Sequence, residues 1–401
     1  MKIINFIYKI YVILYMDNNF YNKIETLIKT LDFEKINLKL IKSNAKKLLA
    51  IWTQIKKLWN QINPNQIEYK IYIRDSNEYN QIIELLKKNF LSSNSNIMNI
   101  INKSNYIHLL NYSNIYFFWL SNLGEKNSTE SDYLVSLNMF KITLCLNQYK
   151  FNNTDEVSRY VIWIPINKKR NFNYDKISKT NLKKTEENFE AFVASGVTYG
   201  IEPRITIVTR YEEVEKLLIH ELIHNYNMDG SGFHENLGDI LNQYKNIKNN
   251  KKEKNFNYHY EYSIYESYTE LLSTYFYLLF ASIQTNKKLN INILISNIII
   301  ELVYSYNIIA NLINLNGYLS YDEFKSKKIF MGNICKYEYY YIKALMYNNF
   351  DLKFGNELDD FNIIYGDIIK MIKKNETDDD VLMELVYQNY IKHNNFKYQI
   401  H

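Results

Sequence analysis

A short aliphatic segment that contains two histidines and one glutamate constrains this chain more than any other feature. The segment reads Leu-Leu-Ile-His-Glu-Leu-Ile-His and runs from Leu217 to His224. An α-helix turns about 100° and rises about 1.5 Å per residue, so His220 and His224 would lie on one face, about 6 Å apart. Glu221 would project close to the same face. Because the neighbouring residues are aliphatic, we expect this helix to be buried on nearly all sides.

Burying these three polar side chains without partners would be costly, and a metal ion removes that cost. Two imidazoles separated by one helical turn can bind one tetrahedral zinc ion. A carboxylate beside the ion can take a proton from a bound water. The residues therefore predict a zinc site with His220 and His224 as ligands and Glu221 as general base. The alternative is a buried helix whose histidines are satisfied within the core.

Signals on both sides of the segment predict where the helix lies. The run Arg204–Val208 predicts a strand directly before it. Thr209 is a good N-cap, and Glu212 three residues later completes a capping-box pattern. Asp229 and Gly230 supply a stop signal, with Asp229 as a turn residue. These signals predict a helix over about 210–227.

A catalytic zinc ion usually has three protein ligands, so a third is expected elsewhere in the chain. A second helix is predicted over 260–283, and it carries a polar stripe on a surface rich in Leu, Phe and Tyr. The stripe consists of His259, Tyr262, Glu266, Glu270, Ser273 and Tyr277. Such a stripe favours a buried polar partner, for which a zinc site is suitable. The alternative is a solvated face with two exposed glutamates.

The motif HExxH followed by a helical E-x-x-x-E is similar to the pattern of the gluzincin zinc metallopeptidases. The run from Glu266 to Glu270 resembles their E-G-x-T-E variant, with Ser267 in place of the frequent glycine. The resemblance covers Thr209–Ser273 and leaves most of the chain unmatched. It implies one Zn²⁺ per chain, with Glu266 as the third ligand. It also implies that Glu270 holds a ligand histidine through the distal N–H of that ring.

His234 is the alternative third ligand. The metzincin pattern HExxHxxGxxH requires Gly at position 227 and His at position 230, where this chain has Asn227 and Gly230. That family is therefore disfavoured. His234 could still bind the metal from a loop, or it lines the cleft or is exposed.

The order of predicted elements indicates an α+β fold. Residues 1–65 read as a helical region, 66–230 as an α/β subdomain that ends in the HExxH helix, and 231–401 as a helical subdomain that carries the third ligand. The predicted strands are Glu68–Ile73, Ile115–Leu120, Tyr133–Leu146, Tyr160–Ile166 and Arg204–Val208, with a helix over Glu78–Phe90. Later helices are predicted near 260–283, 289–314, 335–348 and 358–373. The resemblance implies a zincin-like arrangement of a mixed sheet and an active-site helix.

Two apolar stretches raise the question of a membrane. The run Leu289–Leu315 contains Glu301 and several Asn residues, which favours a buried core helix with a paired carboxylate. Ile3–Met16 is interrupted by Lys9, and no small-residue cleavage site follows it. An ordinary helix or leader is favoured there over a signal or anchor, and translation from Met16 is a further alternative. We expect no stable membrane span.

The amino-acid composition excludes some classes of protein and leaves others open. The formal net charge is only +5, from 48 basic and 43 acidic residues, so no nucleic-acid partner is expected. Cys145 and Cys335 cannot form a disulfide framework, and two buried thiols are favoured over one bridge. The 38 Tyr against 10 Gly and 3 Pro indicate an AT-rich genome, such as that of a large DNA virus or a parasite. An intracellular location, or the host cytoplasm or virion for a viral protein, is favoured, with secretion as the alternative.

Together these residues predict a zinc-dependent metallopeptidase whose substrate is a peptide or protein. Zincin architecture further implies that the strand Arg204–Val208 binds an extended substrate by edge pairing. One alternative is a non-catalytic virion or host-interaction protein that retains a zincin-like fold, which the intact Glu221 disfavours. Another is a zinc hydrolase that acts on a non-peptide amide. The oligomeric state is not indicated.

Overall fold

The computed structural model describes most of the chain and divides it into two compact units. The described residues are 36–89, 101–122, 130–152, 156–165, 196–199, 204–209, 213–233, 235–237, 240, 260–315, 320–323, 334–377 and 386. One unit, here called the sheet unit, runs from Gln54 to Asn227. The other, the helical unit, contains residues up to Thr53 and from Met228 onward. The fold class is α+β with a mixed sheet, as predicted.

The sheet unit contains a six-stranded sheet in the order β1-β2-β3-β4-β6-β5. The strands are β1 (Glu68–Ile73), β2 (Tyr106–Tyr112), β3 (Ile115–Ser121), β4 (Arg159–Ile164), β5 (Gly196–Tyr199) and β6 (Arg204–Thr209). The central strands β3, β4 and β6 are parallel, while β1, β2 and β5 join them in antiparallel pairs. The predicted strands at β1, β3, β4 and β6 are confirmed, whereas β2 and β5 were not predicted.

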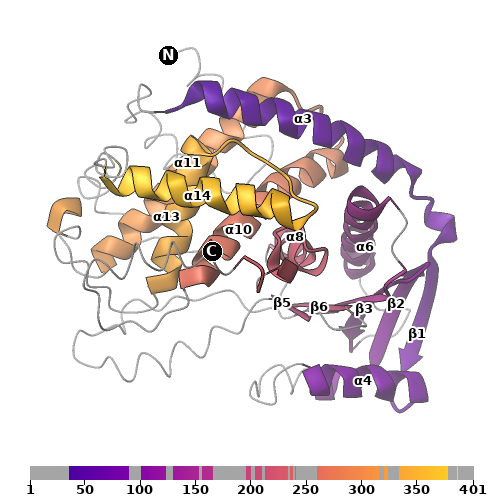
Figure 1. Ribbon diagram of the computed structural model, residues 1–401. Coiled ribbons are helices and arrows are strands. Elements are labelled where there is room, and N and C mark those ends of the chain that lie inside the picture. The colour runs from indigo at the N-terminus through magenta and orange to yellow at the C-terminus, as the bar shows by residue number, and fades with distance from the viewer. Residues whose placement is uncertain are drawn as a thin grey trace, which may run out of the picture. The chain divides into compact units, whose positions relative to one another are not determined.

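Side-chain alternation gives the sheet two different faces. Helix α4 (Asn77–Asn89) covers one face, while α6 (Glu130–Phe151) and α8 (Val214–Asn225) lie on the other (Figure 1). On β6, Ile205 and Ile207 belong to the core cluster on the α4 side. Because neighbouring residues in a strand point to opposite faces, Thr206 points toward α8 instead. The face that carries the HExxH helix therefore contains polar groups within an apolar sheet.

The strand predicted over Tyr133–Leu146 is wrong, because this segment lies within the helix α6. Its apolar residues are interrupted singly by Ser136, Asn138, Lys141 and Thr143. A strand and a buried helix both fit a run of this kind. The helix is 22 residues long and buries apolar side chains in its second half, among them Met139, Ile142 and Cys145. Burial raises the pKa of the Cys145 thiol, as expected for a structural cysteine. The side chain of Cys335 lies outside the described residues.

The predicted N-terminal cap of the HExxH helix is also wrong. Thr209 is the last residue of β6, so its side chain belongs to the sheet. Helix α8 begins at Val214, and its cap residue Glu213 has a left-handed backbone with φ 52° and no side-chain capping hydrogen bond. The strand continues further than the capping pattern suggested, and the capping signal at Thr209 and Glu212 is therefore coincidental.

The helical unit is built around α13. Its helices are α10 (Tyr260–Gln284), α11 (Ile291–Leu315), α13 (Ile334–Asn349) and α14 (Leu358–Thr377), which match the four predicted ranges closely. Helix α13 packs against α10, α11 and α14. Helix α3 (Leu38–Gln61) begins in this unit, where Asn44 exchanges hydrogen bonds of 2.9 Å with the backbone of Phe350 and Leu352. Short 3-10 turns occur at Pro64–Gln66 in the sheet unit and at Ser231–Phe233 in the helical unit.

Helix α11 is long and apolar enough to cross a membrane by length and composition, over Ile291–Ala310. However, 78% of its most apolar window is buried inside the structure. Its carboxylate Glu301 lies 3.8 Å from Nζ of Lys343, which is the pairing predicted for it. These observations agree with a core helix.

Candidate metal centre

The two histidines of the HExxH motif lie on one face of α8. The ring centroids of His220 and His224 are 5.0 Å apart, with the rings in an edge-to-face arrangement. Both side chains are half-buried. Two imidazoles that converge in this way form a donor set that zinc accepts, so the residues present fit the ion.

The carboxylate of Glu221 is held against the end of the sheet. Its side chain is buried, with 7% exposed, and Oε2 accepts a hydrogen bond of 2.9 Å from the hydroxyl of Thr198. The same hydroxyl lies 3.0 Å from the backbone carbonyl oxygen of Glu221. Thr198 belongs to β5, which pairs with β6 in an antiparallel register. Glu221 is thus held by a strand that neither the HExxH motif nor its flanking residues predict.

A glycine on the same strand provides the space for Glu221. A Cβ atom added at Gly196 would lie 2.6 Å from both Cγ and Oε1 of Glu221, which is closer than real Cβ contacts. Glycine is required at position 196 for steric reasons and not for its backbone conformation. Among the described glycines, Gly230 has the positive φ. A side chain at position 196 would therefore displace the carboxylate.

This close approach predicts the effect of Gly196→Ala. The added methyl group should move the Glu221 carboxylate, and turnover should fall by about 10- to 100-fold, since small misplacements of a catalytic group are costly. Zinc content should stay at the wild-type value, because the three atoms nearest to the added Cβ all belong to Glu221. Kinetics and elemental analysis of the purified variant would measure both.

Gly366→Ala is the matched control, because a Cβ added at Gly366 on α14 meets nothing within 4 Å. It should leave turnover unchanged. Equal kinetics in both alanine variants would show that Glu221 does not depend on the space at Gly196.

The glutamates of the predicted stripe lie in the helical unit, one turn apart on α10. Glu266 is half-buried. Glu270 is buried, and its carboxylate accepts hydrogen bonds from Nζ of Lys343 at 3.3 Å and from the hydroxyl of Ser273 at 3.2 Å. The alternative of a solvated face with two exposed glutamates is therefore wrong.

Lys343 joins two carboxylates in this buried cluster. Its side chain is 1% exposed and forms ion pairs with Glu270 and Glu301. Burial raises the pKa of the neighbouring Tyr339 hydroxyl well above its ordinary value, and the negative charge of Glu270 raises it further. Tyr339 is therefore a neutral hydrogen-bonding group at physiological pH. The sequence pattern did not indicate Lys343, because its contact with Glu270 joins helices far apart in the chain.

Asp229 is a turn residue, as predicted. Its Oδ1 accepts hydrogen bonds from the backbone N–H and the hydroxyl of Ser231, at 3.1 and 2.8 Å. Its Oδ2 accepts one of 2.9 Å from Thr269, which lies between the two glutamates of α10. The hydroxyl of Tyr365 donates to its backbone carbonyl. Asp229 thus joins the turn after the HExxH helix to the helix that carries Glu266.

Three residues considered from the sequence cannot be assigned a place. His234, the alternative ligand, lies outside the described residues, as do His259 and Glu212. The roles of His220, His224, Glu266, Glu221 and Glu270 as site residues stay predictions.

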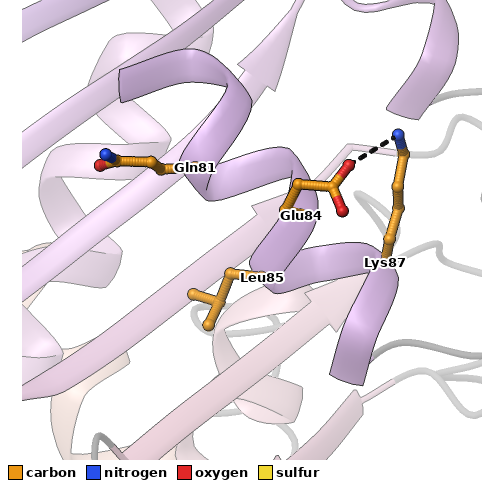
Figure 2. Close-up of a pocket in the computed structure, with 4 residues that line it drawn as sticks. All are labelled: Gln81, Glu84, Leu85 and Lys87. Carbon is orange, nitrogen blue, oxygen red and sulfur yellow. Dashed lines mark hydrogen bonds and ion pairs between the residues drawn. The ribbon is translucent and has the colours of Figure 1, made fainter. Parts of the chain in front are cut away.

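A hollow on α4 offers no competing chemistry. It is lined by Gln81, Glu84, Leu85 and Lys87, which all come from this one helix (Figure 2). Lys87 and Glu84 form an ion pair of 3.2 Å on its rim. An exposed pair of this kind contributes little to stability. The hollow contains no arrangement of groups that resembles a catalytic site.

Comparison with protein-family models, with curated proteins and with solved structures found no match to this chain.

Proposed function

We propose that this protein is a zinc-dependent metallopeptidase with a zincin-like fold. One observation carries the proposal most: the two imidazoles converge on one face of α8, and a carboxylate beside them is held by a strand of the sheet. A buried helix that only needed satisfied histidines would not require a neighbouring carboxylate fixed in this way. This contrast favours a catalytic site over a site that binds metal for structure alone.

His220 and His224 would hold the ion, together with Glu266. Each of the three offers one ligand atom of a kind that zinc accepts, an imidazole nitrogen or a carboxylate oxygen. The assignment of Glu266 rests on its position in the E-x-x-x-E pattern of α10. Glu270 is the residue that would orient a ligand histidine, and Nζ of Lys343 lies 3.3 Å from its carboxylate.

Zinc, when bound, would acidify a water molecule and polarise the substrate carbonyl. Glu221 would take a proton from the attacking water and then donate it to the departing amine. Because the Thr198 hydroxyl donates to Oε2, the carboxylate would stay oriented while the proton moves. Burial of Glu221 would exclude bulk water from this transfer.

The edge that could bind an extended substrate is β5 rather than β6. Edge pairing by Arg204–Val208 is wrong, because β4 and β5 occupy both edges of β6. Among the described strands, β5 lies at the end of the sheet. Since Gly196 and Thr198 on β5 contact Glu221, a peptide paired with this strand would run beside the general base.

The proposal is tested by zinc content together with peptide cleavage. Purified wild-type protein should contain about one zinc ion per chain and should cleave members of a mixed peptide library, with activity lost in a chelator and restored by zinc. Protein that holds zinc but cleaves no peptide would support the non-catalytic alternative. Protein that holds no zinc would overturn the metal centre.

A further inference from the structure

A chain of polar side chains, all buried except the half-buried Thr198, leads from an arginine on β4 to the carboxylate of Glu221. Nε of Arg159 donates to Oδ1 of Asn225 at 3.1 Å, and Nδ2 of Asn225 donates to the hydroxyl of Thr206 at 2.9 Å. The hydroxyls of Thr206 and Thr198 are 3.4 Å apart, and Thr198 donates to Oε2 of Glu221 at 2.9 Å. All five residues belong to the sheet unit.

The arginine fixes the orientation of the Asn225 amide, from which the next hydrogen bonds of this chain follow. A guanidinium has only donors, so the amide of Asn225 must turn its oxygen toward Arg159 and its NH₂ group toward Thr206. Thr206 accepts from that NH₂ group, which leaves its own hydrogen for Thr198. Thr198 can then direct its hydrogen to Glu221. With Thr206 as the donor to Thr198, the donors point toward Glu221, whose Oε2 and backbone carbonyl oxygen lie 2.9 and 3.0 Å from the Thr198 hydroxyl.

Arg159 is placed to hold the Asn225 amide in this orientation. Arg159 is 1% exposed. Cζ of its guanidinium lies 4.9 Å from the ring centroid of Phe151 and 5.0 Å from that of Tyr226. A second donor, the NH1 group, bonds to the carbonyl oxygen of Val157 at 3.2 Å. Because an arginine does not lose its proton in proteins, the Asn225 amide keeps its oxygen toward Arg159 and its NH₂ group toward Thr206.

Asn225 is anchored at its backbone as well as at its side chain. It is the last residue of α8 and directly follows His224. Arg204, which pairs with Arg159 across β4 and β6, donates to the backbone carbonyl of Asn225. The helix that carries the HExxH motif is therefore tied to two adjacent strands at its end.

We propose that Thr198 is a positioning residue for Glu221, and that Arg159, Asn225 and Thr206 keep its hydroxyl donating to the carboxylate. The inference rests on the proposed function, in which Glu221 is the general base. The hydroxyl of Thr198 acts through Glu221 and not on the substrate. Its loss should therefore lower kcat and leave KM unchanged.

Thr198→Val tests this role, because valine keeps the shape and the strand preference of threonine but removes the hydroxyl. We expect kcat to fall by about 10- to 100-fold, as for the loss of a hydrogen bond to a charged group. KM and zinc content should not change. Thr198→Ser restores a hydroxyl and should recover most of the activity. Thr143→Val is the control and should behave as wild type, because it removes a buried threonine hydroxyl that, within the described part of the chain, bonds to the Met139 carbonyl of the same helix.

Asn225→Asp tests the direction of the chain. Aspartate can still accept from Arg159 but cannot donate to Thr206, so the Thr206 hydrogen would turn away from Thr198. We expect a fall in kcat similar to that of Thr198→Val, with zinc retained. Unchanged kcat in both variants would overturn the proposal, and equal loss in Thr198→Val and Thr198→Ser would assign the position a packing role instead.

A second measurement separates this inference from the proposed function. Crystal structures of the metal-free wild type and of Thr198→Ser should show the Glu221 carboxylate in one orientation, while Thr198→Val should show it displaced or in several. This readout needs no activity. If wild-type protein cleaves no peptide, the proposed function fails while the positioning role is still decided. One unchanged orientation in Thr198→Val would overturn the positioning role by itself.

Discussion

Glu221→Gln should retain zinc and the fold but lose peptide hydrolysis, with a fall in kcat of about 100- to 10,000-fold, the range for general acid–base catalysis. Glutamine matches the shape of glutamate but cannot accept the proton from water. The hydroxyl of Thr198, which donates to Oε2 in the wild type, can still donate to the amide oxygen. The variant therefore removes the chemistry with little change in position. Steady-state kinetics and elemental analysis would measure the two effects separately.

Glu215→Gln supplies a matched control on the same helix. It makes the same carboxylate-to-amide change in the first turn of α8, before the motif. Turnover should stay near the wild-type value. Wild-type turnover in Glu221→Gln would remove Glu221 as the base, whereas a large loss in both variants would point to a general effect of charge on this helix.

The local parts of the site could be predicted from the sequence because one helix contains them. The spacing of His220 and His224 determines their common face once α8 is a helix, and the aliphatic flanks predict that helix. The same reasoning predicted α10 with its polar stripe. In each case the residues concerned are within a few turns of one another.

The groups that hold Glu221 could not be predicted in this way. Gly196 and Thr198 approach it because β5 pairs with β6, and Arg159 joins the hydrogen-bond chain because β4 lies on the other side of β6. These neighbours depend on strand order, which periodicity does not determine. Thr206 has a weak signal, since a polar residue alternates with Ile205 and Ile207 in an otherwise apolar strand. That alternation could have indicated polar contacts on the α8 side of the sheet.

Two errors have the same physical origin. The capping pattern at Thr209 and the strand reading of Tyr133–Leu146 both used local preference alone. Burial in the tertiary structure overrode both: β6 continues to Thr209, and α6 is helical because it packs on the sheet and against α8. The local preference of a sequence predicts secondary structure least well where a segment is apolar on all sides.

Glu266→Ala should lose zinc almost as severely as His224→Ala. A ligand carboxylate supplies both a bond and a negative charge to the ion, while a residue that only orients a ligand typically changes metal affinity by about 10- to 100-fold. Glu270→Ala should therefore lose zinc only in part. His234→Ala should retain zinc, because the spacing around His234 does not match the metzincin pattern. Zinc titration against a competing chelator would rank all four variants.

Glu270→Gln is needed beside Glu270→Ala, because the carboxylate is also the partner of the buried Lys343 at 3.3 Å. Removing it leaves Lys343 with Glu301, and a loss of stability could then imitate a loss of zinc affinity. Thermal unfolding of the metal-free variants separates the two effects, since Glu266→Ala should melt near the wild type. Loss of zinc in His234→Ala with retention in Glu266→Ala would contradict the gluzincin pattern and indicate a site of three histidines.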